Sequence, residues 1–174
     1  MKRVMIVGQP GAGKSTTARM IGETTGLPVV YIDQIHWMDG WIEREKPEKI
    51  KLIRLEEVKD LWVIEGGLSQ TWENRLDRAD TLIVLDFPLW LRAWRVFWRT
   101  IKFRGQSRPD LPAGCPERFD LEFWQWIWNT RTTGKRKAVA LIDKASPDTD
   151  VHHLKSPRQV RHYLSHLEKR VERG

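Results

Sequence analysis

The sequence predicts an α/β fold with a central parallel sheet, and two features carry this prediction. Short apolar runs that end in Gly, Pro or Asp alternate along the chain with longer segments of helical periodicity. Strand-helix-strand units with right-handed crossovers bring such runs together in one sheet that is covered by helices. The chain has 174 residues, of which 40% are apolar and 30% charged. This is enough for one core, so residues 1–174 are predicted to form a single domain.

Apolar runs predict four buried strands, at residues 3–7, 29–33, 61–65 and 81–86. Helical periodicity predicts helices between them and beyond, at residues 14–25, 47–59, 69–78, from Pro88 to about 103, and over most of 116–144. A last strand is predicted at 150–155, and the helix after Pro157 repeats apolar residues at every third or fourth position.

The net charge of +7 is concentrated in one segment. Residues 90–137 hold eleven Lys or Arg against four Asp or Glu, together with six of the ten Trp. The predicted helix after Pro88 carries its aromatic residues on one face and Arg92, Arg95 and Arg99 on another. A basic, aromatic segment should attract a polyanion, which is either the phosphates of a nucleotide or a nucleic acid.

Residues 8–15 read Gly-Gln-Pro-Gly-Ala-Gly-Lys-Ser, which fits G-x-x-x-x-G-K-[ST] between a predicted strand and a predicted helix. This pattern is a phosphate-binding loop (P-loop), in which backbone N–H groups at a helix start wrap the phosphates. Lys14 is expected to reach the β and γ phosphates, Ser15 to hold Mg²⁺, and Thr16 to donate to the α phosphate. ATP and Mg²⁺ are thus the expected ligands. The loop residues expected to bind ATP are Gly8, Gly11, Ala12, Gly13, Lys14, Ser15 and Thr16.

Nearly the whole chain resembles the bacterial group of DNA topology modulation proteins, a branch of the adenylate-kinase-like P-loop proteins. Besides the P-loop, the motifs that carry this resemblance include Tyr31-Ile32-Asp33-Gln34, Trp62-Val63-Ile64-Glu65-Gly66, Leu85-Asp86-Phe87-Pro88, Arg108-Pro109-Asp110 and Gly114-Cys115-Pro116-Glu117. The resemblance implies a P-loop NTPase three-layer sandwich, with a five-stranded parallel sheet of order 2-3-1-4-5 and a mobile lid. One motif departs from the group, which usually has Asp-Gly-Asn-Tyr-Ser where this chain has Glu-Gly-Gly-Leu-Ser at 65–69.

Asp33 ends the second predicted strand, at the edge where open α/β sheets bind ligands. If the phosphoryl acceptor is an alcohol, this carboxylate would orient and deprotonate the hydroxyl. If the acceptor is a nucleoside monophosphate, no base is needed, and Asp33 would bind the substrate or metal-bound water. A strand-end Asp that caps a loop is the third interpretation. The acceptor is expected to bind over residues 34–60.

Two carboxylates compete for the second place near Mg²⁺, because Glu65 and Asp86 both terminate apolar strands. In the kinases that the chain resembles, the acid after the third strand, followed by Gly, lies near the metal. Glu65 is therefore favoured, and Asp86 stays a candidate metal ligand.

The basic, Trp-rich segment 90–137 is predicted to be a helical lid. Phosphoryl transfer needs positive charge on the migrating group, which is supplied when the site closes. The candidate catalytic cations of the lid are Arg95, Arg99 and Arg108, although each one could also lie on a solvated helix face. Arg104 and, after the last strand, Arg158 are candidate nucleotide contacts, with Arg158 near the adenine. An ordinary helix start explains Ser156-Pro157 equally well.

The favoured function is an ATP-dependent kinase that phosphorylates a nucleoside monophosphate or a small metabolite. The alternative is a nucleic-acid-binding ATPase that affects DNA topology, with weak nucleic-acid binding through 90–137. No apolar run reaches the length of a membrane span, and Gly8 to Ser15 interrupt any leader-like start. The lone Cys115 suits a reducing compartment, so a cytoplasmic location is expected.

Overall fold

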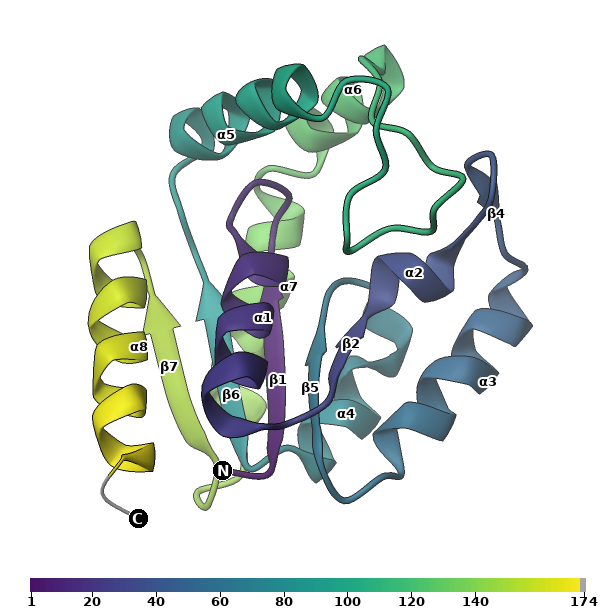
Figure 1. The fold of residues 1–174 in the computed structure, drawn as a ribbon. Helices are drawn as coiled ribbons and strands as arrows, with labels where there is room; N and C mark the ends of the chain where they lie inside the picture. The colour runs from purple at the N-terminus through teal and green to yellow at the C-terminus, as the bar shows by residue number, and fades with distance from the viewer. Residues whose placement is uncertain (173–174) are drawn as a thin grey trace.

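The structure is a computed structural model that describes residues 1–172, and its centre is a five-stranded parallel sheet between two layers of helices (Figure 1). The sheet order is β2-β5-β1-β6-β7. Numbered within this sheet alone, that order reads 2-3-1-4-5. The strands are β1 (Arg3–Gly8), β2 (Val29–Tyr31), β5 (Trp62–Glu65), β6 (Thr81–Leu85) and β7 (Asp150–Leu154).

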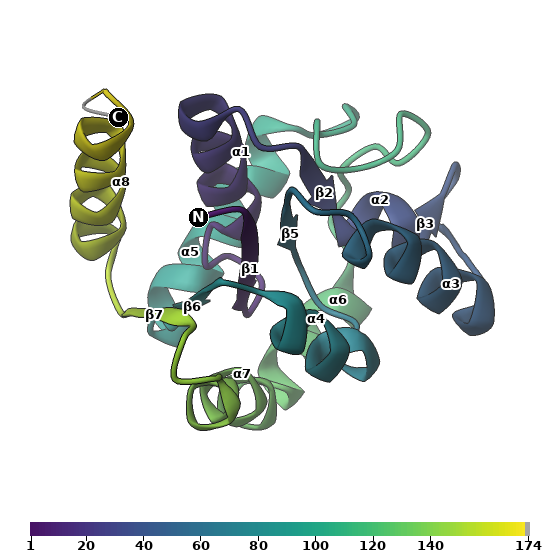
Figure 2. The same cartoon turned by 90° about the horizontal axis from the view of Figure 1, so that it is seen from below.

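Helices cover both faces of the sheet, as Figure 2 shows in a view from below. One face packs against α1 (Lys14–Thr25) and α8 (Pro157–Val171). The other packs against α3 (Lys46–Glu57), α4 (Trp72–Arg78) and α7 (Thr133–Lys144). Alternate residues of β1 serve the two cores, since Val4 and Ile6 point to the first and Met5 and Val7 to the second. A strand that is buried on both faces explains why the sequence is continuously apolar there.

Between β2 and β5 the chain forms a small unit that the sequence analysis did not resolve. It consists of the short helix α2 (Ile32–His36) and a hairpin of β3 (Trp37–Met38) and β4 (Ile42–Glu43). The expected strand 29–33 is shorter than predicted, because the chain turns into α2 directly after Tyr31. Asp33 therefore lies in the first turn of a helix rather than at the end of a strand.

The lid segment begins with α5 (Leu89–Lys102), continues through a loop and reaches α6 (Leu121–Asn129). The prediction of one nearly continuous helix over 116–144 is wrong, because this segment forms two separate helices, α6 and α7. Asp120 caps the start of α6 by accepting from the amide of Phe123 (3.1 Å). At the break, the side chain of Gln9 donates to the carbonyl of Thr130 (2.7 Å). This contact ties the junction between the two helices to the P-loop.

The helix predicted at 69–78 begins one turn later than expected, because residues 69–71 form the 3-10 turn η1 (Ser69–Thr71) before α4. Within residues 1–172, no helix is both long and apolar enough to cross a bilayer.

Candidate active site

The P-loop connects β1 to α1, and its glycines are required by geometry. Gly11 has φ +78°, and a Cβ there would lie 2.4 Å from the carbonyl oxygen of Arg92. Gly13 has φ +92° and occupies the position before the first helical residue, Lys14. Both backbone conformations are rarely adopted by residues with a side chain. The loop is thus a compact turn at the N-terminus of α1, where free backbone N–H groups favour an anion.

The first turn of α1 lies beside the end of β5. The hydroxyl of Ser15 donates to Glu65 Oε1 over 3.1 Å. Strands β1 and β5 are parallel neighbours in the sheet, with Ile6 opposite Glu65, so the end of β5 lies beside the P-loop that follows β1. Burial raises the pKa of the Glu65 carboxylate, and the positive charge of Lys14 offsets part of that rise. Three of the predicted site residues, Lys14, Ser15 and Glu65, therefore lie together.

Glu65 is the most unusual group of this site. Its side chain is buried, and its Oε2 finds no hydrogen-bond partner within residues 1–172. Burial is the main cause that raises the pKa of Glu65 to about 7, and the negative charge of Asp33 adds to the effect. An unpaired buried carboxylate oxygen is costly. It is explained when a cation or its water takes the free position.

The donor set fits Mg²⁺ in this respect. Mg²⁺ in nucleotide sites is bound through few protein oxygens, together with phosphates and retained waters. Ser15 Oγ and Glu65 Oε2 are the oxygens that could hold it. Within residues 1–172, no group of three or more His, Cys, Asp or Glu side chains forms a metal site of its own.

Acidic groups surround Glu65 on the side of α2. The charges of Asp33 and Asp110 both raise the pKa of Glu65. The pKa of the Tyr31 hydroxyl is also raised, first by burial and then by the charges of Glu65 and Asp110. Gln34 donates to the carbonyl of Pro109 over 2.8 Å, which holds the lid loop against α2. The space between the P-loop and α2 is therefore bordered by carboxylates.

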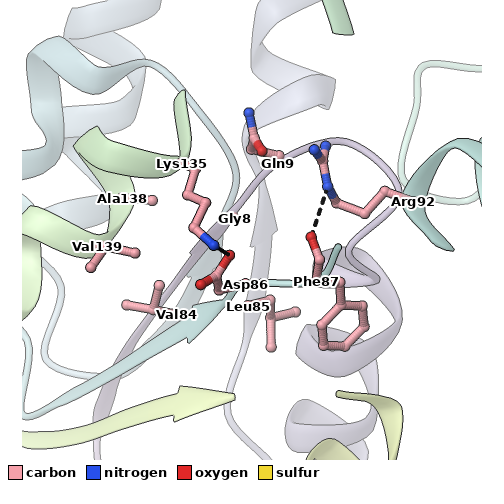
Figure 3. A pocket seen from close by; sticks show the side chains of 10 residues that line it. All are labelled: Gly8, Gln9, Val84, Leu85, Asp86, Phe87, Arg92, Lys135, Ala138 and Val139. Carbon is pink, nitrogen blue, oxygen red and sulfur yellow. Dashed lines mark hydrogen bonds and ion pairs between the residues drawn. The ribbon is translucent and has the colours of Figure 1, made fainter. Parts of the chain in front are cut away.

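Asp86, the other candidate metal ligand, lies in a different environment (Figure 3). Its Oδ1 is 3.0 Å from Lys135 Nζ, and its Oδ2 is 3.2 Å from His153 Nε2. Both carboxylate oxygens are therefore occupied, in contrast to the free oxygen of Glu65. The contacts of Asp86 tie β6 to β7 and to α7.

Two arginines on α5, Arg92 and Arg95, point inward, toward the P-loop. Arg92 is buried and donates to the carbonyls of Phe87 (3.1 Å) and Pro10 (3.3 Å). Arg95 makes a long contact of 3.4 Å with the carbonyl of Ala12 and lies over the ring of Phe87. Burial lowers the pKa of Arg95, and the positive charge of a nearby arginine adds to this effect. Arg95 thus lies against the P-loop, beside Ala12 and Gly13.

Two other lid arginines are held by a buried acid instead. Glu117 accepts from Arg99 Nε (3.1 Å) and from Arg108 Nε (2.8 Å), and also from the hydroxyl of Thr100 (3.2 Å). Arg108 NH1 pairs with Asp110 over 2.6 Å. Burial is the main cause that lowers the pKa of Arg99, followed by the charge of Arg108. This ion network fastens the loop after α5 to the last turns of that helix.

In the described part of the chain, the side chains of the three remaining candidates, Thr16, Arg104 and Arg158, form no hydrogen bond or ion pair with the site residues named above. Thr16 is exposed at the start of α1, and Arg104 and Arg158 are exposed without a side-chain partner within residues 1–172. Near Arg95, the positive charge of α8 comes from Arg161 rather than from Arg158.

Four residues that shape the site were missed as site residues from the sequence. Arg92 belongs to the recognised Arg stripe, but nothing in the periodicity says that it anchors the loop. Gln9 occupies a variable position of the P-loop pattern. Asp110 and Glu117 were seen only as parts of motifs. The one available signal was that Asp110 and Glu117 lie close in sequence to several arginines, which could have indicated ion pairs within the lid.

Comparison with known proteins supports the fold. A shikimate kinase from Acinetobacter baumannii, in complex with shikimate, has a TM-score of 0.56 and 14% identity over 99% of this chain and 93% of that chain. Shikimate kinase from Aquifex aeolicus vf5 has a TM-score of 0.50 and 18% identity over 99% of each chain. No protein-family model and no curated protein matches the sequence. The chain therefore has the α/β fold of P-loop kinases, and these identities establish the fold alone.

Proposed function

We propose that the protein is an ATP-dependent kinase that transfers the γ-phosphoryl group to a hydroxyl of a small molecule. The observation that carries this proposal is the cluster of Lys14, Ser15 and the half-paired Glu65 at the end of the central strands. Gly8 to Thr16 would hold the phosphates of ATP, with Lys14 on the β and γ groups. Bound Mg²⁺, held by Ser15 and Glu65, would neutralise charge on those phosphates.

Asp33 is the proposed general base. The acceptor hydroxyl would bind between α2 and the P-loop, within residues 34–60 and the groups beside them. Its oxygen would form a bond to the γ phosphorus while the bond to the β-phosphate oxygen breaks. ADP would leave, and the hydroxyl proton would go to Asp33. Arg95 would stabilise the charge that develops on the migrating group.

The acidic border of the acceptor side favours a hydroxyl over a phosphate as the acceptor group. Asp33 and Glu65 would repel a nucleoside monophosphate unless cations compensated for them, whereas Asp110 is already paired with Arg108. The cations of the hairpin and of the buried face of α3, Arg44 and Lys49, are each already paired with a glutamate. The acceptor class that we propose is therefore a neutral or cationic alcohol.

Three other predictions from the sequence concern the topology modulation group, nucleic-acid binding and the cellular location, and they remain proposals. The resemblance to the topology modulation group supports a P-loop kinase but does not name a substrate. Nucleic-acid binding through 90–137 is less favoured because Arg92, Arg95 and Arg99 contact the chain itself. A cytoplasmic location, where ATP is available, belongs to the same proposal.

The test is ADP formation from ATP and Mg²⁺ across a panel of neutral alcohols, aminated alcohols, carboxylated alcohols and nucleoside monophosphates. A neutral or cationic alcohol should raise turnover in the wild type. Lys14→Ala should abolish this rise, and Asp33→Asn should reduce it by about 10²–10⁴-fold, as loss of a general base does. Lys169→Ala and Asp77→Asn, which change exposed residues of α8 and α4, are the matched controls. Preferential use of nucleoside monophosphates would overturn the acceptor class, and ADP formation stimulated only by nucleic acid would overturn the proposal.

A further inference from the structure

The outer face of α5 is apolar and exposed. Its residues are Trp90, Trp94, Phe97, Trp98 and Ile101, with side chains between 43% and 71% exposed, and together they form what we call the aromatic face of α5. In Figure 1 this helix lies at the outer edge of the molecule, beyond the P-loop. Large aromatic residues gathered on one exposed helix face commonly mark an interaction site in a folded protein.

Rotation of α5 about its axis cannot bury this face, because the opposite side of the helix is already packed against the P-loop and the core. Arg92 and Arg95 donate to P-loop carbonyls, and Val96 is fully buried. The backbone of α5 also approaches Gly11 so closely that a Cβ there would not fit. Rotation of α5 would break all of these contacts, so the aromatic face points outward as a consequence of how the P-loop is held.

The aromatic face is also preorganised. The rings of Trp94 and Trp98 meet edge to face with centroids 5.4 Å apart, and Phe97 meets Trp98 in the same way at 6.0 Å. Such packing fixes the side chains before any partner binds, which lowers the entropy cost of binding. Five large side chains, each about half exposed, offer on the order of 500 Å² per chain. Two such faces would bury roughly 1,000 Å², the lower end for a specific interface.

Charge identifies the kind of partner. The five residues of the aromatic face are uncharged, and the three arginines of α5 turn toward the P-loop and the lid loop. The remaining cation of the helix, Lys102, lies at its C-terminal end, beyond Trp98 and over the ring of Phe103, so it falls at the rim of this face. A nucleic acid or an anionic membrane is recognised through cations that lie beside the aromatic groups. Homodimer interfaces are instead apolar, rich in aromatic residues and poor in charge at their centre. The neutral aromatic face therefore matches a second copy of itself.

We propose that a second copy of this chain docks on the aromatic face of α5, with the two helices antiparallel about a two-fold axis. A two-fold axis near the middle of the stripe would place the Trp94 and Trp98 positions of both copies at the centre of the interface. Antiparallel packing also sets the two helix dipoles in opposite directions, which is favourable. The interface would hold α5 in position, and through Arg92 and Arg95 it would stiffen the P-loop. Dimer formation and ATP binding would then strengthen each other.

Sedimentation velocity of the full chain over a wide range of concentration tests this proposal. The wild type should form a dimer. Trp98→Glu should abolish the dimer across the whole range, because the symmetric interface would bury two carboxylates at its centre, whereas Trp98→Phe should keep it. Leu55→Glu is the matched control, since Leu55 is 54% exposed on the distant helix α3, and this variant should still dimerise. Circular dichroism checks that each variant is folded.

Salt dependence separates the possible occupants of the face. Each copy carries a net charge of +7, so added salt screens the repulsion and should strengthen the dimer. Binding of a polyanion weakens with salt instead. A wild type that stays monomeric, or a dimer that Trp98→Glu leaves intact, overturns the proposal. Binding of single-stranded DNA or of anionic vesicles to a monomeric wild type at low salt, lost in Trp98→Glu, would assign the face to a polyanion and would also overturn it.

Discussion

Replacing Glu65 by Gln should stabilise the ligand-free protein at alkaline pH while it removes activity. Burial raises the pKa of Glu65 from its ordinary 4.5 to about 7. The folded state therefore binds this proton more tightly than the unfolded state, and the free energy of unfolding falls as the pH rises from 4.5 to 7. One pKa unit corresponds to about 1.4 kcal/mol, so the full loss amounts to about 3 kcal/mol. Most of it, roughly 2–3 kcal/mol, falls between pH 5 and pH 8.

Glu65→Gln keeps the shape and removes the charge, so it should escape this loss. Urea unfolding of the ligand-free wild type and of Glu65→Gln at both pH values gives the measurement. The stability advantage of the variant should grow by roughly 2–3 kcal/mol from pH 5 to pH 8, and the matched exposed control, Glu45→Gln, should show no such growth. ATP with Mg²⁺ should stabilise the wild type more than the variant. A difference between wild type and Glu65→Gln that does not change with pH would refute the reasoning.

Three further predictions concern the P-loop, the core and the lid. Gly11→Ala should lower ATP affinity at least 10-fold, because its Cβ would meet the Arg92 carbonyl at 2.4 Å, and titration calorimetry measures this. Glu57→Gln should cost about 3–5 kcal/mol in urea unfolding, since it leaves the fully buried Arg75 without its ion partner. Glu117→Gln should speed tryptic cleavage in the loop after α5, because two arginines lose their shared acid.

Each of these predictions has a control of the same chemistry on the surface. Gly26→Ala also has a positive φ, but a Cβ there meets nothing within 4 Å, so only stability should change and ATP affinity should stay. Glu56→Gln removes an exposed helical ion pair and should cost less than about 1 kcal/mol. Glu122→Gln, exposed on α6, should leave the tryptic pattern unchanged. Equal effects of variant and control in any of the three pairs would contradict the corresponding argument.

The sequence predicted the sheet well because buried parallel strands leave a strong local signal. Runs such as Val4 to Val7 are apolar on both faces, and the Gly-Lys-Ser ending of the P-loop fixes the strand and the helix on either side of it. The helix start at Pro157, with Ser156 as its cap, was likewise readable, since capping chemistry is local.

The sequence could not predict which way an amphipathic helix faces. The pattern of α5 contains an aromatic face and a cationic face, and periodicity alone does not say which of them meets the protein. Here the P-loop carbonyls and the acid Glu117 hold the cations, so the aromatic face is exposed. The pairing of Arg99 and Arg108 with the same glutamate is also a long-range contact, which no local motif encodes. Asp33 was predicted to end a strand, but β2 has only three residues and Asp33 lies in α2. The exact end of a strand is a boundary that local propensity rarely determines.

The most direct test of the proposed function is detection of the product itself. Phosphorus NMR of the wild type with ATP, Mg²⁺ and the best alcohol of the panel should show a new phosphomonoester that grows as ATP is consumed. Asp33→Asn should form it far more slowly, and Lys14→Ala should not form it. Release of inorganic phosphate without any phosphomonoester, from every alcohol tried, would contradict the assignment of a hydroxyl-directed kinase.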